Sequence, residues 1–206
     1  MEWHEPISLP AHAVRDPRLR PRHISLLVAA YYLAAKRGPG ETDFRATNGE
    51  LMRLARIKDR DSFYSHRDDL HRLGYITHQA RPGEPAYYRL PERVDVLIPS
   101  GVIADRRIET AGAIALYVAL SSLAEDRVIA TYGWDDRPLY GDACTVGNRD
   151  LIKLCGYSTR QQLTRYRNEL IALDVLEVDS HMGLPPTYTL PLNIAANEVY
   201  ETAPVT

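Results

Sequence analysis

Hydrophobic positions along the chain form the same series of segments twice. In the first half, apolar residues dominate from Ile24 to Ala35 and stop at Gly38-Pro39-Gly40, which predicts a helix over 24–36. Two amphipathic segments follow, predicted as helices over 48–55 and 60–73. Two strand-like segments, 75–79 and 86–90, then flank a polar tip. The predicted order is helix, helix, turn, helix and hairpin.

The second half repeats this order. Residues 148–191 align with 48–91 without a gap and share twelve identical pairs, where about three are expected by chance. Upstream, 96–108 matches 7–19. The predicted second set comprises helices 112–124, 148–155 and 160–173 and strands 175–179 and 187–190. We therefore expect two domains, 1–93 and 94–206, the second with a longer loop at 129–146 and a C-terminal tail.

Local signals at the segment ends agree with this assignment. Thr47-Asn48-Gly49-Glu50 has capping-box spacing, Ser158-Thr159-Arg160-Gln161 supplies a cap in the second copy, and Gly74 is placed to end a helix. The expected fold class is α+β, mainly α, as two tandem winged helix-turn-helix domains. Units of this type also serve as protein-interaction modules, so the fold leaves two classes of function open.

Charge excludes some functions and leaves others open. The chain of 206 residues has 25 Lys and Arg against 27 Asp and Glu, which argues against a general polycationic coat on nucleic acid. The charges are uneven: 1–93 carry 16 cations and 12 acids, and 94–206 carry 9 and 15. Of the cations, 22 are arginine, which fits a GC-rich genome or bidentate contacts to phosphate and guanine. Two focused contact surfaces are compatible with this balance.

Location and cofactors follow from the same composition. The start has no basic-then-apolar signal pattern, and the longest apolar stretch is too short to span a bilayer, so we expect a cytoplasmic protein that does not contact membranes. Cys144 and Cys155, with His181, do not complete a zinc site. We expect free thiols, no metal and no cofactor.

The third helix of each copy is the candidate for base recognition, because that helix enters the major groove in helix-turn-helix proteins. The second copy has no acid between Gly156 and Asn168, and its outward residue types are those that contact bases. These candidates are Arg160, Gln161, Thr164, Arg165 and Asn168. An ordinary solvated face is the alternative.

In the first copy the corresponding face is mixed. Arg60, Tyr64 and Ser65 are candidate DNA contacts, but Asp61 and Asp68 would repel phosphates. Weak binding, reading of a cytosine amine and docking to protein all remain open for this copy.

Arginines outside these helices add further candidates. Four lie in the segment 12–23 against one acid, Asp16: Arg15, Arg18, Arg20 and Arg22. Such a basic arm could follow the DNA backbone or enter the minor groove. In the alternative interpretation, residues 7–10 form a strand and the arginines cap the helix that follows. Since Asp16 and Arg18 recur in the second copy as Asp105 and Arg107, we expect the DNA contacts to be Arg15, Arg20 and Arg22. Arg81 at the first hairpin tip is a candidate backbone contact.

Two further features, a pair of retained arginines and the 129–146 loop, can each be interpreted either structurally or functionally. Arg67 and Arg167 are retained in both copies, either in a salt bridge to an acid such as Glu50 or Asp150 or as phosphate clamps. The 129–146 loop is acidic and aromatic, which suits a homodimer or other protein contact, or a solvated loop that covers its own domain. Its candidate interface residues are Tyr132, Trp134 and Tyr140.

The pattern of both copies resembles phage and plasmid helix-turn-helix proteins, including replication initiators built from two winged helices and regulators. It rests on LPAHAVRDPRL, the apolar helix, the capped helix and the arginine-started third helix. The resemblance implies sequence-specific binding of double-stranded DNA, in replication initiation or transcription regulation, through the second copy's third helix. The alternative is a protein-interaction subunit of the SMC/kleisin type. No base, ligand set or phosphate loop accompanies the acids of 129–146, so we do not expect an enzyme.

Overall fold

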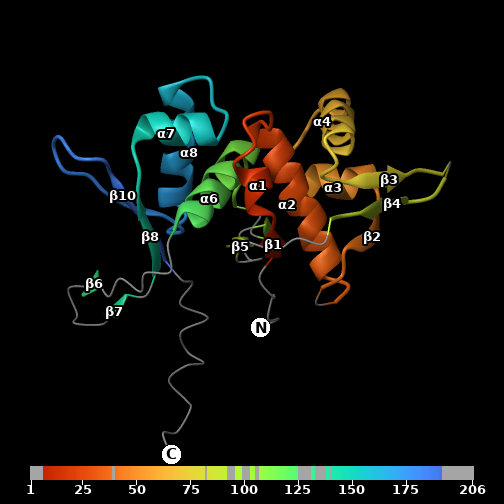
Figure 1. Ribbon diagram of the computed structural model, residues 1–206, viewed down its shortest axis with the longest axis horizontal. Helices are drawn as coiled ribbons and strands as arrows, with labels where there is room; N and C mark the ends of the chain where they lie inside the picture. Colours follow the sequence, from red (N-terminus) through yellow and green to blue (C-terminus); the bar gives the residue numbers. More distant parts are fainter. Residues whose placement is uncertain are drawn as a thin grey trace, which may run out of the picture.

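The computed structural model of this chain describes residues 7–38, 40–81, 83–91, 96–98, 103–104, 107–124, 131–132, 138–139 and 141–191. Within these ranges the protein is a mixed α+β structure, with more helix than strand and small antiparallel sheets (Figure 1). Among the helices described, none combines the length and the apolar character needed to cross a membrane.

The first copy of the repeat, residues 7–91, contains every helix and strand predicted for it. Its elements are β1 (Ile7–Leu9), α1 (Ala11–Val14), α2 (Pro21–Ala35), β2 (Asp43–Ala46), α3 (Asn48–Leu54), α4 (Arg60–Arg72), β3 (Thr77–Gln79) and β4 (Ala86–Arg89). The short helix α1 and the strand β2 were not predicted. The strand β1 matches the alternative interpretation of residues 7–10.

The second copy, residues 96–191, has the same order. Its elements are β5 (Val96–Ile98), α6 (Ala111–Leu123), β6 (Thr131–Tyr132), β7 (Pro138–Leu139), β8 (Gly141–Thr145), α7 (Asn148–Leu154), α8 (Arg160–Ile171), β9 (Glu177–Asp179) and β10 (Thr187–Pro191). The prediction of a loop over all of 129–146 is wrong where the short strands β6 and β7 pair, and again at its C-terminal end. There β8 pairs with β10, as β2 pairs with β4 in the first copy. The second strand of each hairpin, β4 or β10, has backbone N–H and C=O groups on both edges, so it pairs with the first hairpin strand on one edge and with β2 or β8 on the other.

The helix ends explain why these segments fold as they do. Thr47, Asp59, Thr110 and Thr159 are N-caps whose side chains accept a backbone N–H three residues later. After α4, Gly74 lies in the left-handed region (φ 80°), where Tyr75 N–H donates to Leu70 carbonyl at 2.9 Å. After α8, Asp174 takes the same conformation (φ 56°) without being a glycine.

The two copies pack around an internal pseudo-twofold axis. The strands β1 and β5 pair antiparallel, with Ile7 opposite Ile98, Ser8 opposite Leu97 and Leu9 opposite Val96. Because Ser8 and Leu97 hold equivalent places in the repeat, this register relates the copies symmetrically, as in an isologous dimer interface. The helices α2 and α6 pack against each other, and buried residues of both copies form one hydrophobic core (Figure 1).

The segment 12–23 is folded against this core, which differs from the expected basic arm. Val14 and Leu19 are buried, so the segment gains more from packing than from extending into solvent. Asp16 is also buried, and it accepts hydrogen bonds from Arg18 and from the Tyr75 hydroxyl (2.8 Å). The bonded Arg18 guanidinium holds the pKa of the Asp16 carboxyl well below its usual range. Asp16 and Arg18 therefore have the structural role predicted for them.

Candidate nucleic-acid interface

The helices α4 and α8 present equivalent faces to solvent. Over their first eleven residues the alternation of buried, half-buried and exposed positions is identical in the two helices. Phe63 and Leu70 face the core in α4, as Leu163 and Leu170 do in α8. The exposed positions of this stretch are Arg60, Asp61, Ser65 and Asp68 in α4 and Arg160, Gln161, Arg165 and Asn168 in α8.

The α8 face matches the predicted set with one qualification. Arg160, Gln161, Arg165 and Asn168 are exposed, and none of them takes part in an ion pair between described residues. Thr164 is half-buried, and its hydroxyl donates to the Arg160 carbonyl at 3.1 Å. Four of the five predicted side chains are therefore available to a ligand, and two of these four are cationic.

The α4 face is less available. Arg60 and Ser65 are exposed, but Tyr64 is half-buried and its hydroxyl accepts a hydrogen bond from Asn48 Nδ2 at 3.2 Å. The Arg67 guanidinium lies over the Tyr64 ring, 5.0 Å from its centre. Asp61 and Asp68 are exposed beside them, so the α4 surface combines both signs of charge.

The retained pair Arg67 and Arg167 has a role that the sequence did not indicate. Neither forms an ion pair with Glu50 or Asp150 among the described residues, and Arg67 instead bonds to Asp68 at 2.9 Å. Burial raises the pKa of Tyr88 and of Tyr188, and the positive charges of the neighbouring Arg67 and Arg167, respectively, act in the opposite direction. Each arginine therefore lies against the tyrosine of its own sheet, and both members of each pair are retained in the repeat.

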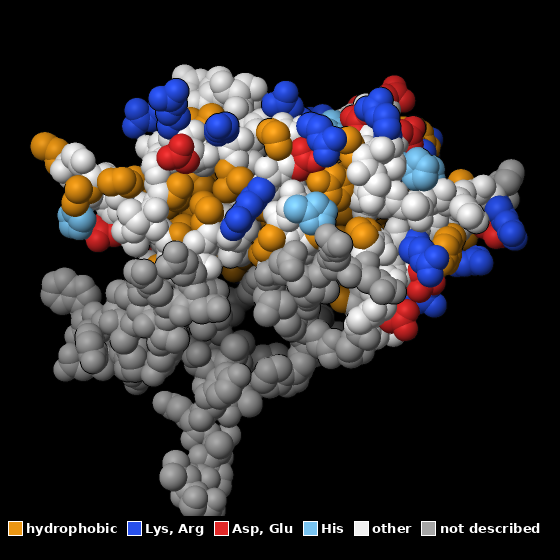
Figure 2. Space-filling model, viewed as in Figure 1, with side chains coloured by type: hydrophobic (Ala, Val, Ile, Leu, Met, Phe, Trp, Pro, Cys, Tyr) orange, Lys and Arg blue, Asp and Glu red, His pale blue; other side chains and the backbone are white. Residues whose placement is uncertain are grey.

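A groove of about 580 Å³ lies where the two copies meet. Its lining includes residues at equivalent repeat positions of both copies, such as Arg56 and Gly156, Lys58 and Ser158, and His66 and Tyr166. The lining also includes Arg165, so the groove is continuous with the exposed face of α8. Lys and Arg side chains extend along this side of the molecule, from over α7 and α8 to over α4 (Figure 2).

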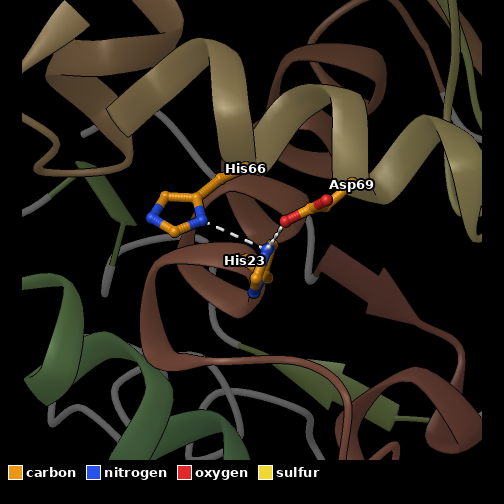
Figure 3. Close-up of side chains that lie close together, drawn as sticks. All are labelled: His23, His66 and Asp69. Atoms are coloured by element: carbon orange, nitrogen blue, oxygen red, sulfur yellow. Dashed lines mark hydrogen bonds and ion pairs between the residues drawn. The ribbon is translucent and has the colours of Figure 1, made fainter. Parts of the chain in front are cut away.

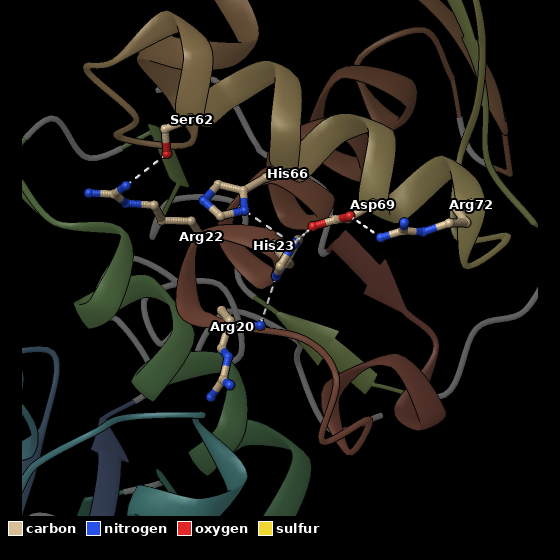
Figure 4. A network of polar contacts seen from close by, with 7 residues as sticks. All are labelled: Arg20, Arg22, His23, Ser62, His66, Asp69 and Arg72. Carbon is tan, nitrogen blue, oxygen red and sulfur yellow. Dashed lines mark hydrogen bonds and ion pairs between the residues drawn. The ribbon is translucent and has the colours of Figure 1, made fainter.

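The arginines of the segment 12–23 occupy different places. Arg20 and Arg22 are exposed and line the groove. Arg22 donates to Ser62 Oγ at 2.7 Å, whereas Arg20 points towards α6 (Figure 4). Arg15 lies elsewhere and donates to the Ser122 carbonyl at 3.2 Å, a contact between the copies. Arg81 is exposed at the tip between β3 and β4.

Beside the groove, His23, His66 and Asp69 form a cluster that the sequence did not indicate, with ligand-type atoms within 4.8 Å of one another (Figure 3). The Arg20 backbone N–H donates to His23 Nδ1 at 2.8 Å, which places the ring proton of neutral His23 on Nε2. That atom faces His66 Nδ1 at 3.1 Å and Asp69 Oδ2 at 3.3 Å. A metal ion on Nε2 would move the proton to Nδ1, against the Arg20 N–H. The cluster therefore fits a hydrogen-bond network better than a metal site.

Burial keeps this network uncharged at its histidines. It lowers the pKa of His66 to about 4, with His23 and Arg22 acting in the same direction. Burial also lowers the pKa of His23, although Asp69 opposes that shift. Asp69 in turn accepts from Arg72 on the outer side (Figure 4). The N-terminus of α2 is thereby fixed to α4, and this positions Arg20 and Arg22 at the groove.

The remaining candidates lie apart from the groove. Burial raises the pKa of the Cys155 thiol to about 12 and of the Cys144 thiol to about 11, while His181 pairs with Asp179 at 3.1 Å. Of the proposed protein-interface residues, Trp134 and Tyr140 lie outside the described residues. For Tyr132 the structure describes only the backbone, in β6.

No family model, no curated protein and no solved structure matches this chain.

Proposed function

We propose that the protein binds double-stranded DNA sequence-specifically, as a replication initiator or a transcription regulator, through two tandem winged helix-turn-helix units. In this proposal α3–α4 and α7–α8 are the helix-turn-helix pairs, and the β3–β4 and β9–β10 hairpins are the wings. The helix α8 enters the major groove. The single observation that carries the proposal is the exposed α8 face, which holds two arginines, a glutamine and an asparagine without an acid.

The chemistry of this face suits base edges. Arginine binds guanine through two parallel hydrogen bonds, and glutamine and asparagine do the same with adenine. Arg160 and Gln161 lie in the first turn of α8, where a recognition helix comes closest to the bases. Arg165 and Asn168 continue the same exposed face along the helix. We therefore assign base reading to α8 and a weaker, accessory contact to Arg60 and Ser65 of α4.

The test is duplex binding by an α8 double variant. Arg160→Ala with Arg165→Ala should weaken binding to duplex DNA at low ionic strength by at least about tenfold, since each lost bidentate contact is worth about 1–3 kcal/mol. The control variant, Lys36→Ala with Arg37→Ala, removes the same charge at the far end of α2. Both variants should keep the wild-type circular dichroism and melting temperature. Absence of salt-dependent duplex binding by the wild-type protein would contradict the proposal.

A protein-docking function is the second candidate, and the β9–β10 tip favours it. Met182 and Leu184 are exposed there, and the tip carries His181 but no arginine or lysine. In that case the chain would be a tandem winged-helix subunit of an SMC/kleisin-type complex. Recovery of a coiled-coil ATPase and a kleisin from the native host, without DNA, would support this candidate. Recovery of one discrete DNA sequence would support the first.

A further inference from the structure

We propose that the groove between the two copies binds the phosphate backbone of the duplex, so that the first copy holds DNA while the second copy reads it. This inference rests on the proposed DNA-binding function and adds a second, sequence-independent site to it. Its basis is the unequal chemistry of the two walls, although the groove lies on the pseudo-twofold axis and its walls come from equivalent parts of the repeat.

The cations of the groove come mainly from the first copy. Arg20 and Thr110 are the equivalent N-caps of α2 and α6, and two residues later Arg22 and Gly112 are equivalent. Lys58 and Ser158 are equivalent in the turns before α4 and α8. Each pair therefore has a cation on the first copy's wall and a small, uncharged residue on the other. Phosphate contacts need cations and carry no sequence information, which matches the first wall.

Three cations of this wall are exposed to a ligand. Arg20, Arg22 and Lys58 form no ion pair with another described residue, and the side-chain bond of Arg22 is to the neutral Ser62 hydroxyl. Arg56 also lines the groove, but its guanidinium donates to backbone carbonyls, including Ile108 O at 2.6 Å. It adds positive potential without being free to bind.

Two carboxylates also line the groove. Asp59 accepts the Ser62 backbone N–H at 2.6 Å as the N-cap of α4, and the exposed Glu109 lies just before α6. Five cationic side chains, with Arg165 among them, stand against these two acids, so the groove keeps a positive balance. Glu109 belongs to the second copy's wall, which increases the contrast between the walls.

Continuity with α8 identifies the occupant as duplex DNA rather than a separate small anion. Arg165 lines the groove and is exposed on the α8 face. Gln162, three residues earlier in the same helix, also lines the groove. A recognition helix in the major groove has the phosphates of both strands beside it. A backbone strand leaving α8 in this direction would meet the wall formed by Arg20, Arg22 and Lys58.

The test compares two triple variants with equal loss of charge. The groove variant, Arg20→Thr with Arg22→Ala and Lys58→Ser, replaces the three exposed cations with small, uncharged residues like those at the equivalent positions of the second copy. The control variant, Lys36→Ala with Arg37→Ala and Arg45→Ala, removes three exposed cations at the opposite end of α2 and on β2. Binding is measured by fluorescence anisotropy over a salt series. The probes are a mixed-sequence duplex and the tightest-binding duplex selected from a random pool.

We expect the groove variant to weaken binding to both duplexes by a similar factor. The slope of log K against log salt should fall by about two to three, since each lost phosphate contact contributes about 0.9. The control should keep a slope within about one unit of the wild type. If wild-type protein binds but the groove and control variants behave alike, the groove inference is overturned and the proposed function stands. A loss confined to the selected duplex would show that the groove reads sequence, which overturns the division between the copies. Failure of the wild type to bind either duplex overturns both proposals.

Discussion

Arg56 joins the two copies, and replacing it tests how they are held together. It occupies the turn between α3 and α4 in the left-handed region, with φ 56°, where the second copy has Gly156 at φ 65°. Its guanidinium donates to Ile108 O at 2.6 Å and Ile103 O at 3.2 Å in the second copy. It also donates to Arg53 O and Leu54 O in its own copy. At the equivalent contact, a Cβ on Gly156 would lie 3.0 Å from Leu19 O, so the second copy uses close approach instead of a side chain.

The expected cost follows from these contacts. Hydrogen bonds from a charged donor are worth about 1.5–3 kcal/mol each, and the half-buried position of Arg56 favours the lower end of that range. Loss of the two bonds between the copies should therefore lower the free energy of unfolding by about 2–4 kcal/mol in Arg56→Ala. Arg56→Gly should be about 1 kcal/mol less destabilising, because only glycine adopts φ > 0 without a steric penalty.

Thermal and urea unfolding of the two variants measure this directly. At about 2–4 °C per kcal/mol for a chain of this size, Arg56→Ala should melt at least about 4 °C below the wild type, with Arg56→Gly between them. Because the copies share one core, unfolding should remain a single transition. A melting temperature of Arg56→Ala equal to that of the wild type would refute the assigned role of the side chain. Equal stability of the two variants would refute the role of the backbone conformation.

Two further predictions concern stability. In the folded protein the pKa of His66 is lowered to about 4, and the pKa of His23 is also lowered. Below pH about 6.5 the unfolded chain therefore binds more protons than the folded one. The free energy of unfolding should be level just above that pH and should fall as the pH drops towards 4. In urea titrations His66→Gln should reduce this slope, and an unchanged slope would contradict the assignment. Asp174→Gly should stabilise the protein by about 0.5–1 kcal/mol and Gly74→Asp should destabilise it by a similar amount, because both positions are left-handed C-terminal caps. Thermal melts in which both variants shift the melting temperature in the same direction would count against this.

The helices and hairpin strands were predictable because the same pattern of apolar and polar positions occurs in both copies of the repeat. Apolar spacing and caps placed α3, α4, α7 and α8 to within two residues, and the Gly74 turn was also predicted correctly. The outward face of α8 followed from Leu163, Leu170 and Leu173 facing inward, since helical period fixes the opposite face. The strands β2 and β8 were missed because they are stabilised by pairing with β4 and β10, which is a non-local contact.

The relation between the copies could not be read from the sequence. Nothing local in Ile7–Leu9 specifies pairing with Val96–Ile98, and the role of Arg56 depends on carbonyls about fifty residues away. The segment 12–23 was expected as an arm because its arginines are conspicuous, but Val14 and Leu19 decide its position by their burial. The groove exists only once the copies are packed, which is why Lys58 was not among the predicted site residues.

Selection of duplexes from a random-sequence pool by the full-length protein tests the central claim most directly. We expect enrichment of one discrete, asymmetric sequence. The preference for bases at one half of this site should be lost when Gln161 and Asn168 are both replaced by alanine. We also expect the groove variant to enrich the same sequence while binding more weakly overall. A pool that emerges without any preferred sequence, from a protein that is folded by circular dichroism, would contradict the claim that α8 reads DNA.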